Sequence, residues 1–184
     1  DMDLKLKDKV AIVTGGAKGI GRAVVEGLLS ENCRVVFADL DEAASQELQE
    51  KYSHRPNDLL FLHGDLSEEA VCESVVKEAV KEMGKINILV NNAGHSSKVR
   101  SARWISREEF DSVYAVNAAG PAQLTRLLLP AMLEYGEGTV ILVSSMAALC
   151  GGLLGGVAYG PAKAAAKMYM DNLRGELRQS GGRA

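Results

Sequence analysis

The sequence has few aromatic residues, no cluster of positive charge and no recognisable metal-binding motif. Its 184 residues carry 21 Lys and Arg against 24 Asp and Glu, a formal net charge of −3, with no polybasic run. A nucleic-acid-binding surface is therefore not expected. The histidines His54, His63 and His95 lack the spacing of HExxH or similar motifs, so no structural metal is predicted.

Cysteine is also scarce, with three residues and no CxxC pair. Such an odd set is typical of free thiols in a reducing compartment, so we expect a cytoplasmic protein in which Cys33, Cys72 and Cys150 are buried. Residues 138–162 lack charge and are long enough to span a membrane. Glycines interrupt this run and its apolar part has only strand length, so no membrane segment is predicted.

The remaining composition is that of one globular domain covering residues 1–184. Hydrophobic residues make up 47% and charged residues 24% of the chain, which is long enough to bury a core. Short apolar runs alternate with segments of helical periodicity, which predicts an α/β doubly wound (Rossmann) parallel sheet with helices on both faces. Strands are expected at 9–14, 34–38, 59–63, 86–90 and 138–145, and helices at 22–30, 41–51, 68–83 and 106–134.

A glycine-rich turn, Gly15-Gly16-Ala17-Lys18-Gly19-Ile20-Gly21, follows the first predicted strand. Strand, glycine turn and helix in this order can form a phosphate site, because the backbone approaches a pyrophosphate and the helix presents free N–H groups. A tight turn that binds nothing is the alternative. Asp39 ends the second strand, where it can accept hydrogen bonds from an adenosine ribose and repel a 2′-phosphate. Asp39 thus favours NAD over NADP, Lys18 favours NADP weakly, and Leu40 adds no cation. A solvated Asp39 that caps the helix at 41–51 is the alternative.

Tyr159 and Lys163 are spaced as neighbours on one helix face, with Cβ atoms about 5–6 Å apart. An ammonium favours the phenolate form, so such a tyrosine can exchange a proton with an alcohol or ketone. The same spacing also occurs by chance. Pro161 lies between the two residues and is tolerated only in the first helical turn, so this helix is expected to begin at about 157–160.

Two further amide-bearing segments are candidates for the site. Asn91-Asn92-Ala93-Gly94 ends the fourth predicted strand, and ligands bind at the carboxyl ends of strands in open parallel sheets. A simple turn is the alternative. Asn117 lies inside the predicted helix 106–134, where a buried amide needs partners, so structural bridging is an equally good interpretation. Pro130 is expected to kink or split this helix.

In their order along nearly the whole chain, these features resemble the short-chain dehydrogenase/reductase family. The resemblance rests on residues 14–21, Asp39, Asp65, residues 91–94, Asn117, Ser144-Ser145, Tyr159 and Lys163. It implies an oxidoreductase that transfers a hydride between NAD(H) and a secondary alcohol or ketone.

The resemblance also assigns roles. Tyr159 would be the general acid/base, Lys163 would assist it and hold the nicotinamide ribose, Ser145 would bind the substrate oxygen, and Asn117 would orient a water for proton relay. Cofactor contacts are implied for Gly15, Lys18, Gly19, Ile20, Gly21, Asp39, Leu40, Asp65, Leu66, Asn91, Ala93, Gly94, Tyr159 and Lys163.

The chain departs from the family pattern in two further ways. The family most often places its serine thirteen residues before the tyrosine, whereas here 159 − 145 gives fourteen and 159 − 144 gives fifteen; Ser145 is the preferred choice. The family also continues with a strand, a loop over the nicotinamide, a substrate lid and a final strand. Only twenty-one residues follow Lys163 (184 − 163), so these parts are expected to be missing and the strand at 140–143 to lie near an open edge.

Three functions are therefore open from the sequence. The leading one is an NAD-dependent alcohol dehydrogenase or ketoreductase, and the others are a non-catalytic nucleotide-binding or dimerising fragment and an NADP-dependent carbonyl reductase. A homodimer or homotetramer is expected through exposed, weakly charged faces of the helices, notably at 124–131 and 162–166. The loops at 95–103 and 146–158, including Leu153, would determine the substrate, which the sequence does not identify.

Overall fold

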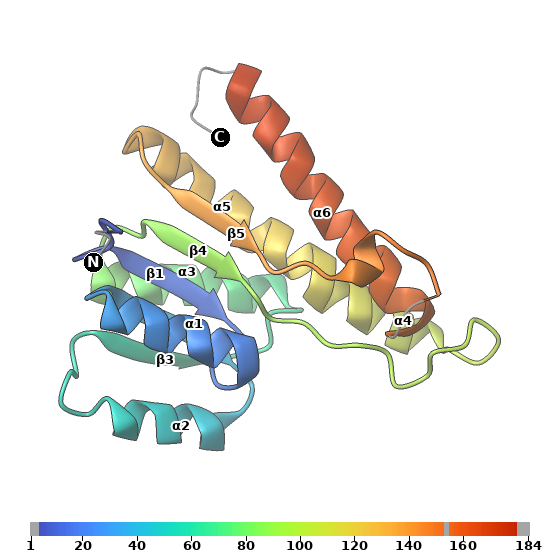
Figure 1. The fold of residues 1–184 in the computed structure, drawn as a ribbon, viewed down its shortest axis with the longest axis horizontal. Coiled ribbons are helices and arrows are strands. Elements are labelled where there is room, and N and C mark those ends of the chain that lie inside the picture. Colours follow the sequence, from blue (N-terminus) through green and yellow to red (C-terminus); the bar gives the residue numbers. More distant parts are fainter. Residues whose placement is uncertain (1–3, 153–154, 180–184) are drawn as a thin grey trace.

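A five-stranded parallel sheet of order β3-β2-β1-β4-β5 forms the centre of the molecule (Figure 1). The computed structural model describes residues 4–152 and 155–179. Leu153, one of the residues expected to face a substrate, lies outside these ranges. All neighbouring strands pair in parallel, and after β3 the chain passes to the other side of β1, where β4 and β5 are added. This arrangement confirms the predicted doubly wound sheet.

The helices and strands alternate along the chain as predicted, although β4 and β5 are shorter than expected. The strands are β1 (Val10–Thr14), β2 (Arg34–Asp39), β3 (Leu59–His63), β4 (Ile88–Asn91) and β5 (Thr139–Leu142). The helices are α1 (Gly19–Ser30), α2 (Glu42–Lys51), α3 (Glu69–Met83), α4 (Arg107–Tyr114), α5 (Gly120–Glu134) and α6 (Gly156–Gln179), with a π-helical segment η1 (Ala115–Ala119) and a 3-10 turn η2 (Met146–Ala148).

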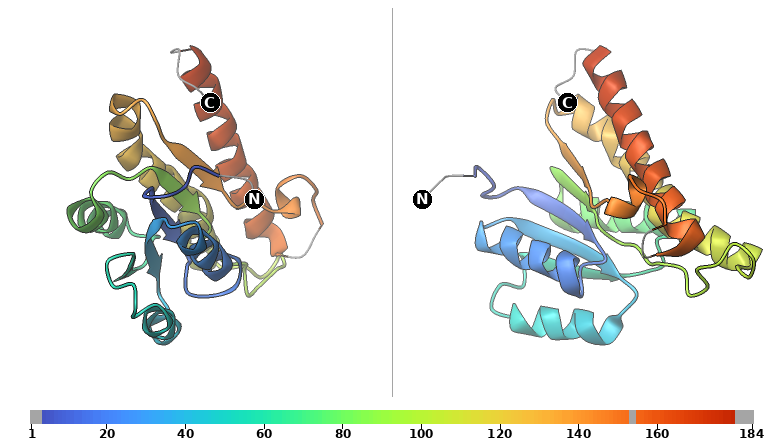
Figure 2. Two further views of the ribbon diagram at one scale, coloured as in Figure 1. Left: turned by 60° about the vertical axis from the view of Figure 1, so that its left-hand side comes forward. Right: turned by 45° about the vertical axis from the view of Figure 1, so that its right-hand side comes forward.

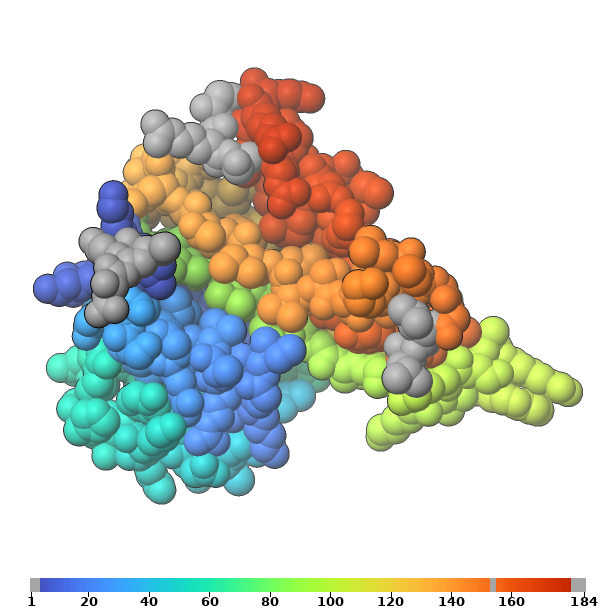
Figure 3. Space-filling model, in the orientation of Figure 1, coloured from blue at the N-terminus to red at the C-terminus, as the bar shows by residue number. Residues whose placement is uncertain are grey.

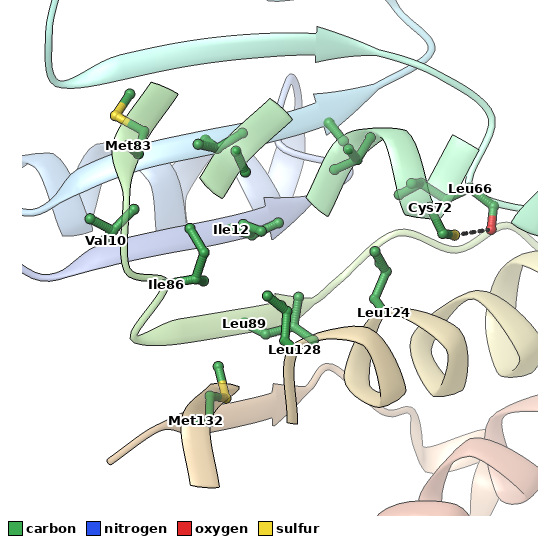
Figure 4. Packing of buried hydrophobic residues seen from close by; sticks show 14 residues of the cluster. Val10, Ile12, Leu66, Cys72, Met83, Ile86, Leu89, Leu124, Leu128 and Met132 are labelled. Atoms are coloured by element: carbon green, nitrogen blue, oxygen red, sulfur yellow. Dashed lines mark hydrogen bonds between the residues drawn. The ribbon is translucent and has the colours of Figure 1, made fainter. Parts of the chain in front are cut away.

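The alternation of side chains along the strands divides the core between the two faces of the sheet. Ile12 of the central strand β1 lies in the cluster formed with α3 and α5, whereas Val13 lies in the cluster formed with α1 and α2. Figure 4 shows Leu89 of β4 beside Leu124 and Leu128 of α5. Because both faces are covered, β1 is buried along its whole length, which is typical of parallel sheets.

The long helix predicted at 106–134 is interrupted, but not at Pro130 as expected. α4 ends at Tyr114, η1 follows, and α5 continues through Pro130. The side-chain amide of Asn117 donates to the carbonyl of Val113 at 2.9 Å, which diverts a main-chain acceptor and accounts for the wider π-helical turn. Pro130 is exposed, so water can satisfy the carbonyl that its missing N–H leaves free.

α6 packs across α4 and α5 (Figure 2). Ala158 and Ala162 contact Val113 of α4, and the Tyr169 hydroxyl donates to the Ala122 carbonyl of α5 at 3.4 Å. The helix begins at Gly156, earlier than the predicted 157–160, so Pro161 lies in the second turn. Its side chain is exposed there, where the missing hydrogen bond faces solvent.

The cysteine prediction is partly wrong. Cys33 and Cys72 are buried free thiols, but Cys150 is exposed, because it lies in the surface loop that follows η2. None of the helices in the described ranges combines the length and the apolar character needed to cross a membrane.

Candidate functional site

A cavity of about 480 Å³ opens where the carboxyl ends of the strands meet. Eleven of the fourteen residues with an implied cofactor contact line it: Gly15, Lys18, Ile20, Asp39, Leu40, Asp65, Leu66, Ala93, Gly94, Tyr159 and Lys163. The fold thus brings the glycine turn, the end of β2 and the tyrosine–lysine pair, which lie far apart in the sequence, to one space.

Thr14 and Asn92 join the ends of β1 and β4 beneath this cavity. The Thr14 hydroxyl accepts from the backbone N–H groups of Asn92 and Ala93, both at 2.9 Å. In return, the Asn92 side-chain amide donates to the carbonyls of Thr14 and Gly15 at 2.9 and 3.0 Å. These bonds hold the start of the glycine turn against the loop after β4, so Asn92 has a positioning role that the sequence did not reveal.

The glycine turn has the geometry of a cradle for a ligand. Gly15 and Gly19 have φ of +65° and +54°, a region that glycine occupies without strain. A methyl group at Gly21 would collide with the Gly15 carbonyl, so α1 could not approach the turn so closely. Lys18 at the start of α1 makes no side-chain cap, which leaves the first N–H groups available to an anion.

Asp39 stands at the edge of the cavity at the end of β2. Its Oδ2 accepts from the N–H of Ala17 at 2.9 Å and its Oδ1 from that of Asp41 at 3.0 Å. These bonds hold the carboxylate in place, and each oxygen keeps a lone pair for a ribose hydroxyl. The alternative in which Asp39 caps the next helix is wrong, because Asp41 caps α2 by accepting from Ala44 N at 3.0 Å.

Tyr159 and Lys163 of α6 line the same cavity from the β4–β5 side of the sheet, whereas Asp39 ends β2 on the other side of β1. Lys163 is only 3% exposed, and its ammonium donates to the Val143 carbonyl at 3.1 Å. Nζ lies 5.9 Å from the centre of the Tyr159 ring. Burial lowers the pKa of Lys163.

Asn117 lies fully buried next to this pair. Its side-chain N–H groups donate to the carbonyls of His95 at 2.8 Å and Val113 at 2.9 Å, while Oδ1 has no partner among the described residues. A methyl group at Gly94 would collide with this oxygen and lie 3.1 Å from Lys163 Nζ. The unpaired oxygen and the ammonium therefore border one small polar space, which suits a water molecule or a ligand hydroxyl.

Two residues singled out from the sequence, Asn91 and Ser145, are not among the residues that line this cavity. Asn91 lies on the same side of β4 as Leu89, so its side chain enters the core and its amide donates to Thr125 Oγ1 at 3.4 Å. Asn91 was expected to contact the cofactor, but the residues after it line the cavity instead. Ser145 begins η2, where its hydroxyl accepts from Ala147 N at 3.2 Å, and the adjacent Ser144 lines the cavity.

One lining residue, Val116, gave no signal of its own in the sequence. Val116 reads as an ordinary apolar helix residue, and it reaches the cavity because it precedes Asn117 in η1. His95, which begins the loop at 95–103 expected to face a substrate, also lines the cavity. Among the described residues, no three His, Cys, Asp or Glu side chains gather to hold a metal ion.

The loops expected to determine the substrate lie side by side beyond Tyr159. The N–H of Val157 donates to the Arg100 carbonyl at 3.3 Å, and Gly156 packs against Arg100 so closely that a methyl group would not fit. In Figure 3 the segment after β5 and the segment after β4 lie together at this end of the molecule. Their exposed side chains include Trp104, Met146 and Leu149.

Known proteins resemble this chain over most of its length. A family model described as short chain dehydrogenase matches residues 9–183. The sex determination protein tasselseed-2 of Zea mays is 37% identical over 185 residues, which cover 98% of this chain and 54% of that protein. A short chain dehydrogenase/reductase of Burkholderia phymatum, solved in complex with NAD, superposes with a TM-score of 0.90 at 28% identity over 97% of this chain and 63% of that one. A metagenomic short-chain oxidoreductase, solved in complex with NADP, gives a TM-score of 0.88 at 29% identity over 97% and 80% of the two chains.

The chain spans about half the length of the curated relatives it matches. Among eight of the most similar ones, the matched part covers between 45% and 59% of the relative's own length. The match nevertheless runs through the glycine turn, Asp39, Asn117 and the Tyr159–Lys163 pair, which line or border one cavity. With its parallel sheet and a family model that covers residues 9–183, this chain belongs to the short-chain dehydrogenase family.

Proposed function

We propose that this chain is part of, or acts as, an oxidoreductase that transfers a hydride between NAD(H) and a secondary alcohol or ketone. The observation that carries the proposal is a single cavity lined both by Gly15 and Asp39, at the ends of β1 and β2, and by Tyr159 and Lys163 of α6, on the β4–β5 side of the sheet. A dinucleotide has this two-ended character, with an adenosine ribose far from its reactive ring.

The residues around the cavity fit a dinucleotide. The N–H groups at the start of α1 would hold the pyrophosphate, and Asp39 would accept from the hydroxyls of the adenosine ribose. Lys163 would bind the second ribose, because its ammonium has donors beyond the one it gives to Val143. A bound nicotinamide supplies the hydride, which no side chain of the protein can provide.

Tyr159 would hold or release the proton that accompanies the hydride. The buried ammonium of Lys163 lies 5.9 Å from the centre of its ring, where it would attract the negative charge that develops on the phenol oxygen as the proton moves. In the reverse direction, the phenol donates to the ketone oxygen. We assign to Ser145 a hydrogen bond to the same substrate oxygen, because its hydroxyl accepts from Ala147 N and keeps its own hydrogen for donation.

Asn117 would complete a path by which the proton is replaced. Its Oδ1 has no partner among the described residues and faces the space beside Lys163 Nζ. A water molecule held there could pass a proton between the lysine and solvent. Asn117 would then have both roles weighed from the sequence, because its N–H groups also bridge His95 and Val113.

Fluorescence titration with NADH and NADPH, followed by turnover assays on secondary alcohols and ketones, tests the proposal. NADH binding with turnover of any member of the panel is the expected result. NADH binding without turnover would instead indicate a non-catalytic nucleotide-binding chain. NADPH that binds at least as tightly as NADH would indicate the NADP-dependent carbonyl reductase, whose cofactor the metagenomic neighbour holds. Failure to bind either nucleotide would contradict the proposal.

We also propose a homodimer or homotetramer formed through α5 and α6. Part of the surface expected to associate is used within the subunit, since Leu124, Leu128 and Ala162 are buried. Leu133 of α5 and Met168 of α6 are 52% and 58% exposed and are candidates for the contact. Sedimentation at micromolar concentration should show the oligomer, and a monomer alone would contradict it.

A further inference from the structure

Lys18 and Asp41 form an ion pair at the adenosine end of the cavity. Lys18 lines the cavity together with Asp39 and Leu40, whereas Asp41 lies beyond the lining. The Asp41 carboxylate raises the pKa of Lys18, and the ammonium lowers the pKa of Asp41. The cation that the sequence places beside the cofactor is therefore already engaged by a carboxylate on the next helix.

The charges around this end of the cavity oppose a 2′-phosphate. Asp39 and Asp41 contribute two negative charges against one positive charge from Lys18. Arg22, the other cation on the first part of α1, is paired with Glu26 and Glu47 at 3.2 and 3.0 Å. A phosphate on the adenosine ribose would meet Asp39 directly and would have to draw Lys18 away from Asp41 to gain a partner.

We propose that Asp41 is a positioning residue for cofactor choice, because it holds the Lys18 ammonium away from the place of a 2′-phosphate. This inference rests on the proposed function, since it refines the cofactor preference of the same site. Asp39 disfavours the 2′-phosphate by direct repulsion. Asp41 disfavours it because it pairs with Lys18, the cation that lines the adenosine end of the cavity. Selectivity against NADPH then depends on two acidic residues.

Asp41 also has a structural role, which the test has to keep. Its Oδ1 caps α2 by accepting from Ala44 N, and asparagine caps helices about as well as aspartate. Asp41→Asn therefore removes the charge and keeps the cap. Glu42→Gln is the matched control, because Glu42 is adjacent, acidic and exposed, and its partner in the structure is His63 at 3.9 Å.

The measurement is the ratio of the dissociation constants of NADPH and NADH, from fluorescence titrations at low ionic strength. Asp41→Asn should shift this ratio toward NADPH by about two- to fivefold, the range expected for one exposed charge interaction. Glu42→Gln should leave the ratio unchanged. In a Lys18→Met background, Asp41→Asn should have much less effect, because the cation it releases is gone.

An unchanged ratio in Asp41→Asn would overturn the inference, and so would an equal shift in the Lys18→Met background. Either result could occur with NADH binding intact, which separates this failure from failure of the proposed function. If the unsubstituted chain binds neither nucleotide, both fail together. Thermal unfolding of Asp41→Asn should match that of the unsubstituted chain, which shows that the cap is retained.

Discussion

Replacing Lys163 by methionine should make the protein more stable and less active. Lys163 is 3% exposed, and among the described residues its ammonium has one hydrogen-bond acceptor, the Val143 carbonyl at 3.1 Å. Burying a charge costs several kcal/mol, of which one charge-assisted hydrogen bond offsets about 1.5–3 kcal/mol. Methionine keeps the length and apolar stem of the side chain without the charge.

The net gain in the free energy of unfolding should be about 1–2 kcal/mol, within the range of single stabilising substitutions. For a chain of this size, that corresponds to a rise in Tm of about 3–6 °C. Turnover should fall by about 10²–10⁴, because the ammonium would no longer support the proton transfer proposed for Tyr159.

The stability difference should depend on pH in a defined direction. Burial lowers the pKa of Lys163 in the folded chain below its ordinary value of 10.5. Between the lowered pKa and 10.5 the unfolded chain binds more protons, so the stability of the unsubstituted protein rises with pH in this window. The advantage of Lys163→Met should therefore be complete below the window and disappear as the pH approaches 10.5.

Urea unfolding across this pH range measures the effect, with Lys167→Met as the control. Lys167 lies one turn further along α6, is 43% exposed and pairs with Asp171 at 2.6 Å, so its replacement should bring no gain. Lower stability of Lys163→Met than of the unsubstituted chain near neutral pH would contradict the prediction. A gain in stability that persists unchanged above pH 10.5 would contradict it equally.

Two further predictions concern the serines and the acid stability of the fold. Ser145→Ala should lower kcat by about 10²-fold, because the proposed donor to the substrate oxygen is the hydroxyl at the start of η2. Ser144→Ala should change kcat much less. Steady-state assays that give the reverse order would assign the role to Ser144 instead. Glu137 binds Lys85 and Lys9, which lower its pKa to about 2. The stability that the Glu137 carboxylate contributes is present above its ordinary pKa of 4.5 and is lost as the pH falls toward 2. Glu137→Gln should therefore lower Tm at pH 7 and have the same Tm as the unsubstituted chain near pH 2. An equal decrease in Tm at both pH values, measured by calorimetry, would contradict this.

Much of the fold follows from local patterns in the sequence. The apolar run at 59–63 corresponds to β3, and the strand–glycine–helix order places the turn at the end of β1. The interruption at η1 was not predicted, because it depends on the Asn117 amide reaching back to the Val113 carbonyl, which no periodicity of apolar residues reveals. Pro130 was the more obvious candidate for a helix break. It does not end the helix, because it is exposed and water can bind the carbonyl group that its missing N–H leaves free.

The sequence predicts which residues reach the site when they directly follow a strand. It predicts this less well when the outcome depends on the direction in which a side chain points. Asp39 and the Tyr159–Lys163 pair line the cavity as their positions suggested. Asn91 does not, although strand alternation with the buried Leu89 could have placed it in the core. The pairing of Lys18 with Asp41 depends on the approach of α1 to α2 in three dimensions, and only the structure reveals it.

The central claim is that Tyr159 transfers the proton while the rest of the cavity binds the nucleotide. A single-turnover measurement of NADH fluorescence decay, with a ketone that the unsubstituted chain reduces, tests it most directly in Tyr159→Phe. We expect NADH binding close to that of the unsubstituted chain and a hydride-transfer rate reduced by about 10²–10⁴. Hydride transfer at the unsubstituted rate in Tyr159→Phe would contradict it.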